Sequence, residues 1–151
     1  MEQGITDFKE YIDNDCYFVD KTRLIAHLVD HPSKVHLITR PRRFGKTLNL
    51  SMIRYFLEEP LPRGADTGGS QPNASLFEGM SITQHPQFRE YLGQYPVIAL
   101  SFKDVKEPNH NDCMAIIRKM LSTEYQRHEY LQNCNVLRDA DKELALESGG
   151  A

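Results

Sequence analysis

The chain has 151 residues, of which 40% are hydrophobic and 26% charged, and its formal net charge is −3. These values are typical of one globular domain, so we treat residues 1–151 as a single domain. No apolar run approaches the 18 residues of a transmembrane helix, and the acidic start Met1–Gly4 is unlike a signal peptide. The three cysteines are too few and too widely spaced for a disulfide framework, which favours a cytoplasmic location.

The first elements expected along the chain are a short amphipathic segment and a helix. The apolar spacing of residues 8–15 predicts a short amphipathic element that ends in a polar turn. A second helix is expected from Asp20, placed as an N-terminal cap, to Val29, and Pro32 stops it. Its leucine, isoleucine and valine residues repeat on one face, which therefore should be buried.

The most informative stretch is residues 35–57, which predict a strand, a tight loop and a helix. Val35–Thr39 is short, apolar and rich in β-branched residues, as in a buried strand. The following loop ends in Gly45-Lys46-Thr47, and an apolar helix is expected from Lys46 to about Leu57. This layout is typical of a phosphate-binding loop at a helix N-terminus.

Each residue type in this loop has a chemical reason to be there. Gly45 permits close approach of the backbone to phosphate oxygens, while Lys46 would reach the terminal phosphates of ATP and act as the catalytic cation. The Thr47 hydroxyl would bind Mg²⁺. The complete set that we assign to nucleotide binding is Arg40, Pro41, Arg42, Arg43, Phe44, Gly45, Lys46, Thr47 and Leu48.

The loop lies in a basic part of the chain and lacks one glycine of the usual motif. Residues 32–56 hold six lysine and arginine residues and no acidic residue, although the whole chain is acidic, and this asymmetry suits a polyanion. Arg40 occupies the position where the usual motif has its first glycine, so Arg40 must adopt an ordinary backbone conformation. Arg42 and Arg43 either contact phosphate oxygens or are simply exposed to solvent, and we interpret Phe44 as a packing residue.

The second half of the chain carries weaker signals. Residues 60–75 are rich in proline, glycine and serine, which predicts a flexible surface loop. Val97–Phe102 is a second apolar strand, and Asn109 opens a long helix whose expected buried face is Ala115, Ile116, Met120, Leu121 and Tyr125. A last helix is expected over residues 137–146, and residues 148–151 should fray.

Four segments, in order, resemble one protein family. Arg40–Thr47 resembles the signature loop of the AAA-ATPase-like family, Tyr17–Thr22 its N-terminal Tyr-Val-Asp-Lys-Thr element, Ser75–Ile82 its Leu-Phe-x-Gly-Leu-x-Ile segment, and Tyr95–Val105 the strand that follows. The resemblance covers roughly residues 4–130. It implies ATP and Mg²⁺ as ligands, an arginine in place of the first glycine of the loop, and frequent fusion to a C-terminal nuclease-like domain of the PD-(D/E)XK type.

The fold expected from these elements is a P-loop type α/β/α three-layer domain with a mainly parallel sheet. Such a sheet normally has about five strands, and the chain offers two clear ones, so the domain looks truncated. Hydrolysis requires a carboxylate beside Mg²⁺, and the resemblance places it on an apolar strand ending Asp-Glu that this chain lacks. Asp104 fits that role poorly. We therefore expect an N-terminal fragment that binds ATP and hydrolyses it poorly or not at all.

Two other functions are compatible with the motif. A small-molecule P-loop kinase would need an arginine-rich lid, and the loop of residues 60–75 has little arginine. A non-enzymatic nucleic-acid binder could use the basic window of residues 34–54, although few aromatic residues interleave with it. His27 and His31 have the spacing of a metal-binding pair on a helix, but no third ligand is evident, so we expect no zinc site.

Overall fold

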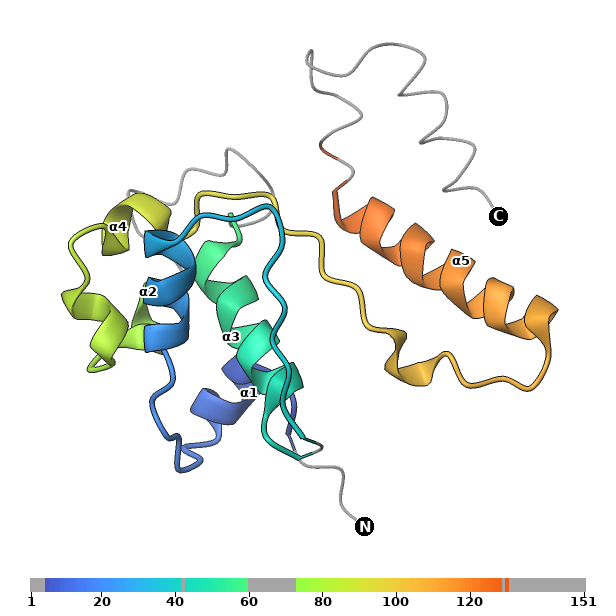
Figure 1. Ribbon diagram of the computed structural model, residues 1–151, viewed down its shortest axis with the longest axis horizontal. Coiled ribbons are helices and arrows are strands. Elements are labelled where there is room, and N and C mark those ends of the chain that lie inside the picture. Colours follow the sequence, from blue (N-terminus) through green and yellow to red (C-terminus); the bar gives the residue numbers. More distant parts are fainter. Residues whose placement is uncertain (1–4, 42, 60–72, 129, 131–151) are drawn as a thin grey trace. The chain divides into compact units, whose positions relative to one another are not determined.

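The structure is a computed structural model that describes residues 5–41, 43–59, 73–128 and 130. The chain divides into two compact units, residues 1–97 and 98–151, which are described separately. The helical elements of the first unit are α1 (Phe8–Asp13), α2 (Arg23–Asp30), α3 (Lys46–Leu57), the 3₁₀ turns η1 (Ala74–Phe77) and η2 (Ser81–Gln84), and α4 (Phe88–Tyr91) (Figure 1). The bounds of α3 confirm the predicted helix, α2 is a helix as predicted but begins only at Arg23, and the short amphipathic element expected at residues 8–15 forms the helix α1.

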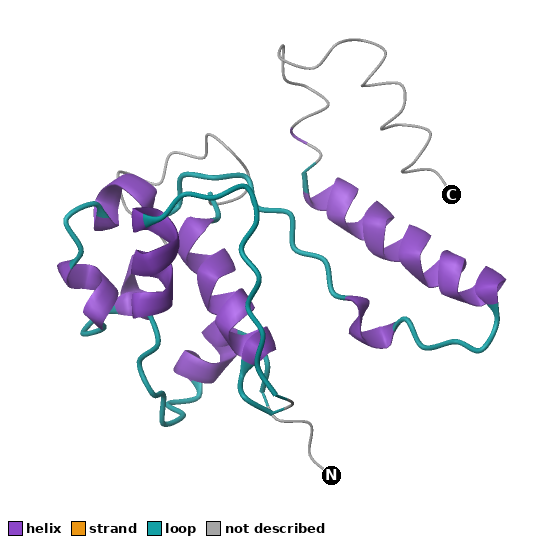
Figure 2. Ribbon diagram, viewed as in Figure 1, coloured by secondary structure: helices purple, strands orange, loops and turns teal. Residues whose placement is uncertain are grey.

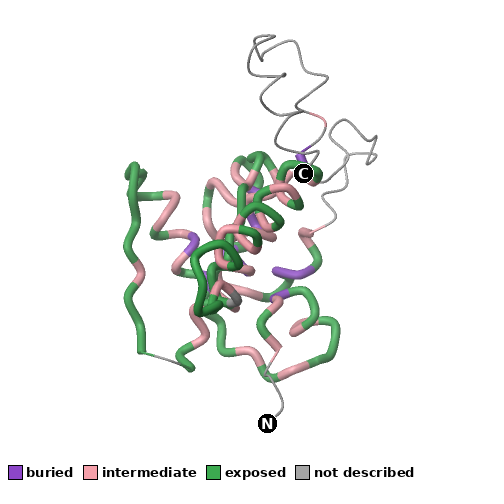
Figure 3. Tube along the Cα trace, turned by 90° about the vertical axis from the view of Figure 1, so that its right-hand side faces the viewer, coloured by how far each residue is buried: buried purple, intermediate pink, exposed green. Residues whose placement is uncertain are grey.

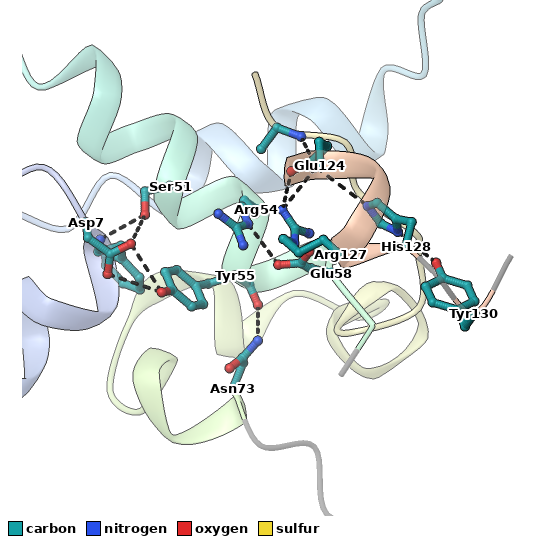
Figure 4. Close-up of polar contacts among 12 residues, drawn as sticks. Asp7, Ser51, Arg54, Tyr55, Glu58, Asn73, Glu124, Arg127, His128 and Tyr130 are labelled. Carbon is teal, nitrogen blue, oxygen red and sulfur yellow. Dashed lines mark hydrogen bonds and ion pairs between the residues drawn. The ribbon is translucent and has the colours of Figure 1, made fainter. Parts of the chain in front are cut away.

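A polar hub joins α1 to α3. The Asp7 carboxylate caps α1 by accepting the Glu10 backbone N–H at 3.0 Å. From α3, the Ser51 and Tyr55 hydroxyls both donate to the same carboxylate at 3.2 Å (Figure 4). The Phe8 N–H in turn donates to the Ser51 oxygen at 2.9 Å. One carboxylate therefore starts α1 and fixes its position on α3.

The hydrophobic core of the first unit has three phenylalanine residues among its eight buried side chains. Its buried residues, purple in Figure 3, are Phe8, Ile25, Met52, Phe56, Leu76, Phe77, Ile82 and Leu92. Phe77 lies at its centre, with ring centroids 5.3 Å from Phe8 and 5.4 Å from Phe56. Three of the eight come from residues 75–82, and Gly79 in that segment has φ +76°, a conformation that side chains rarely adopt.

Two distant segments are hydrogen-bonded to each other at the start of α2. We call this contact, formed by Asp20, Thr22, Ser81 and Ile82, the clasp. The Asp20 carboxylate accepts four hydrogen bonds, from the backbone N–H and the hydroxyl of both Thr22 and Ser81, at 2.6–2.8 Å. The fully buried Thr22 hydroxyl also accepts the Ile82 N–H at 3.1 Å. The prediction that Asp20 caps α2 was wrong in detail, because the cap is Thr22 and its side chain makes no capping bond. Asp20 instead ties α2 to η2.

The predicted three-layer α/β/α fold with a parallel sheet is wrong. Among the described residues no segment forms a β-strand, as Figure 2 shows, and the one β-bridge joins Glu58 to Tyr95 just after α3. Val35–Thr39 is without regular secondary structure, and Leu37 is 85% exposed. Residues 97–101 likewise have no regular secondary structure, Phe102 begins a 3₁₀ turn, and Ile98 is 71% exposed. Strand propensity reflects packing on neighbouring strands, so an apolar β-branched run without such neighbours forms no sheet.

The second unit contains η3 (Phe102–Asp104) and α5 (His110–Arg127). The helix begins where the sequence predicted, within residues 109–112, and Asn109 caps it through its side chain, which accepts the N–H groups of Asn111 and Asp112. The predicted buried face of α5 was wrong, because none of its residues is buried and the Tyr125 side chain is 48% exposed. The predictions for residues 60–72, the helix at 137–146 and the tail at 148–151 fall outside the described residues.

Near the end of α5, Glu124 gathers several donors. Its carboxylate accepts the Ala99 backbone N–H at 2.9 Å and forms an ion pair with Arg127 at 3.0 Å. The buried His128 lies 3.6 Å from the same carboxylate, and its Nδ1 is 3.0 Å from the Tyr130 hydroxyl (Figure 4). This cluster connects the segment before η3 to the last turn of α5.

Candidate functional site

The loop before α3 presents an uncapped helix N-terminus. Gly45 is the N-cap residue, and its φ of 68° and ψ of 24° place it in the left-handed region. No side chain caps the helix, which begins at Lys46 and makes its first backbone bond from the Asn49 N–H to the Gly45 carbonyl at 2.9 Å. The first-turn N–H groups, which have no partner within a helix, are thus available to an anion.

The Lys46 side chain folds back over the loop. Its Nζ donates to the Arg40 carbonyl at 2.6 Å and to the Pro41 carbonyl at 3.0 Å. Both partners are neutral backbone groups, so these bonds hold the ammonium group inside the loop without neutralising its charge. An anion that entered the loop would meet a cation that is already in position.

The arginine residues of the loop differ in conformation. Arg40 is not among the residues with positive φ, which confirms that it takes an ordinary conformation where the usual motif has glycine. Arg43, by contrast, has φ 67°, and a bulky residue in this region is strained. No sequence pattern indicated a positive φ at Arg43. Arg42 lies outside the described residues.

Two adjoining clefts flank the extended segment and the first turns of α3. One of about 320 Å³ is lined by Lys21, Leu24, Ile38, Arg40, Phe44 and Asn49. The other, of about 210 Å³, is lined by His36, Ile38, Lys46, Asn49 and Leu50. They share Ile38 and Asn49, and among the described residues no carboxylate lines either cleft. The larger cleft has a volume at the lower end of the range for small-molecule sites, about 300–1,000 Å³.

The remaining predicted site residues occupy different environments. Thr47 is exposed in the first turn of α3, where its hydroxyl could ligate Mg²⁺ beside a phosphate bound to the same turn. Leu48 packs against the core, so it can offer a ligand only its backbone N–H. Phe44 is 59% exposed and lines the larger cleft, so its interpretation as a packing residue was wrong.

Asp20 is the most perturbed carboxylate near the loop. Partial burial raises its pKa, but the hydrogen bonds from Ser81 and Thr22 outweigh this effect and lower the pKa from 3.8 to about 2. The carboxylate is therefore ionised and fully engaged by its four donors. This geometry explains Asp20 as a structural residue of the clasp.

The described parts of the chain contain no group of three or more histidine, cysteine and acidic residues able to hold a metal ion. The His27 and His31 rings do lie close, with centroids 4.5 Å apart, and the His31 Nδ1 is 3.1 Å from the His27 carbonyl. Within the same described residues, no helix is both long and apolar enough to span a membrane.

Comparison with known proteins adds one match over nearly the whole chain. The family described as "Predicted AAA-ATPase" matches residues 2–148, which include the loop, the clasp and both clefts. No curated protein and no solved structure matches the chain.

Proposed function

The chain belongs to the predicted AAA-ATPase family, and from that premise we propose that Arg40–Leu48 binds the phosphates of ATP as its Mg²⁺ complex. The observation that carries this proposal is the placement of the Lys46 ammonium group. Two backbone carbonyls hold it at 2.6 and 3.0 Å beside the uncapped start of α3, and no carboxylate of a described residue lines the adjoining clefts. In this proposal Lys46 binds the terminal phosphates and Thr47 binds Mg²⁺.

The proposal is for binding and not for hydrolysis. Turnover would also require a carboxylate beside Mg²⁺. The kinase and nucleic-acid alternatives have no observation that favours them. Competition separates them, because a nucleic-acid binder would be indifferent to Mg-ATP and would lose affinity steeply with salt.

Replacing Lys46 by alanine tests the proposal. We expect Lys46→Ala to weaken binding of a fluorescent ATP analogue at least about ten-fold, or about 1.4 kcal/mol, because the positioned cation is lost. The measurement is a fluorescence titration with and without Mg²⁺. Lys34→Ala is the matched control, since Lys34 is exposed in the same basic window but outside the loop. Equal affinities of Lys46→Ala and the wild type would refute the phosphate site.

A further inference from the structure

A second lysine lies at the mouth of the loop. Lys21, two residues before the start of α2, lines the larger cleft together with Arg40 and Phe44. Its Nζ is 3.8 Å from the position that a Cβ atom on Gly45 would occupy. The ammonium group therefore lies close to the residue that immediately precedes Lys46 and the first turn of α3.

This arrangement gathers positive charge without a local counterion. The Lys21 ammonium lies beside Gly45, the N-cap residue of α3, where the positive end of the helix dipole begins. The Lys46 ammonium is held by two backbone carbonyls of the same loop. Within the described residues Lys21 forms no ion pair. Positive charges that share one loop favour a bound anion.

The clasp explains why Lys21 stays in this position. Its neighbours on both sides, Asp20 and Thr22, are fixed by hydrogen bonds to Ser81 and Ile82. The nearest acid in the sequence, Asp20, is already occupied by four donors. The backbone at Lys21 is thus anchored on both sides, while its side chain extends to the cleft.

We infer that Lys21 is a second phosphate-binding residue, which contacts the terminal phosphates of the bound nucleotide from the N-terminal segment. This inference rests on the proposed function. It goes further by adding a residue from outside the loop, and by making the N-terminal segment part of the nucleotide site. The selectivity of the site for ATP over AMP would then depend on Lys21.

Charge removal at Lys21 tests the inference against a matched control on the same segment. Lys21→Gln should weaken ATP about ten-fold and AMP much less, because AMP lacks the terminal phosphates. Arg23→Gln removes the same charge from an exposed residue that does not line the cleft, and it should leave both affinities close to those of the wild type. Lys21→Arg should restore most of the ATP affinity. Affinities come from displacement of a fluorescent ATP analogue.

A second measurement uses the unaltered protein. Acetylation of lysine Nζ groups by acetic anhydride, followed by mass spectrometry, reports their accessibility. Mg-ATP should protect Lys21 from acetylation and AMP should not, while Lys34, which is exposed outside the loop, should react equally in both cases.

The outcomes separate this inference from the proposed function. If Lys46→Ala abolishes binding but Lys21→Gln behaves as Arg23→Gln and Mg-ATP leaves Lys21 unprotected, Lys21 is not a phosphate ligand and the loop proposal stands. If the wild type binds no nucleotide, the loop proposal and this inference are both overturned.

Discussion

At the residue scale, Gly45 and Gly79 allow two turns with positive φ, and the Asp20 carboxylate joins two distant segments. Gly45 and Gly79 both have positive φ, one at the start of α3 and one in the turn that carries Phe77 into the core. Asp20 is exposed to solvent, yet four hydrogen bonds lower its pKa to about 2. Polar contacts of one side chain therefore join residues 61 positions apart in the sequence.

The Asp20 clasp predicts a specific dependence of stability on pH. Its pKa is lower in the folded protein, about 2, than the ordinary 3.8, so its contribution is complete above pH 3.8 and is lost as the pH falls towards 2. Because the group is exposed, we discount the contribution for solvent screening to about 1 kcal/mol. Urea unfolding of wild type and Asp20→Asn between pH 6 and about 2.5 should therefore show a stability difference that shrinks with acid.

Glu78→Gln controls for the loss of a surface carboxylate, because Glu78 is exposed and its side chain makes no hydrogen bond within the described residues. A difference between wild type and Asp20→Asn that stays constant down to the lowest pH would show that the clasp is not electrostatic.

At the element scale, α1 and α3 are joined through Asp7. The carboxylate accepts bonds from Glu10, Ser51 and Tyr55, so it serves as a helix cap and as a tertiary contact together. Burial raises the pKa of the Tyr55 hydroxyl, and the nearby Asp7 carboxylate raises it further. Tyr55 consequently remains protonated and able to donate at any physiological pH.

Removing either partner of this hub should cost a measurable part of the unfolding free energy. We expect Tyr55→Phe to cost about 1 kcal/mol and Asp7→Ala about 2 kcal/mol, because the latter also removes the cap of α1. The double variant should cost less than the sum, since both changes remove the same bond. Tyr17→Phe, at a side chain that is 88% exposed, is the control for chemical denaturation and should be near neutral. Strict additivity would mean that the two groups do not interact.

At the scale of the whole molecule, the helices and 3₁₀ turns of the first unit pack around a hydrophobic core that includes three phenylalanine residues. The extended segment that leads into the loop contributes little to that core, because Val35 is 79% and Leu37 85% exposed. Phe77, in contrast, is fully buried among Phe8 and Phe56. Stability should therefore depend on the core and very little on the segment that the sequence suggested as a central strand.

Two side-chain truncations compare the contributions of the core and of the extended segment to stability. Phe77→Ala should cost about 3–5 kcal/mol through lost contacts and a cavity, whereas Leu37→Ala should change the unfolding free energy by less than about 0.5 kcal/mol. Both are measured by urea denaturation of the full chain. A cost of several kcal/mol for Leu37→Ala would mean that this side chain is buried, as in the sheet that the structure contradicts.

The sequence by itself determined the features that depend on near neighbours in the chain. The start and end of α3, the amphipathic segment that forms α1 and the start of α5 within residues 109–112 follow from local hydrogen bonding and apolar spacing. The match of residues 2–148 confirms the family that four ordered segments suggested. For the site, the loop residues could be proposed because glycine, lysine and threonine have local roles there, and their binding role stays a prediction.

Only the tertiary structure decided the features that depend on distant partners. The sequence predicted strands at Val35–Thr39 and Val97–Phe102, but a strand forms only beside another strand, and no described residue of either segment is in a strand. The Asp20–Ser81 contact and the approach of the Lys21 ammonium to Gly45 also join residues that are distant in the sequence, so no spacing in the sequence could predict them. Local chemistry fixes which residues can form an element or bind a phosphate, whereas long-range packing fixes which of them meet.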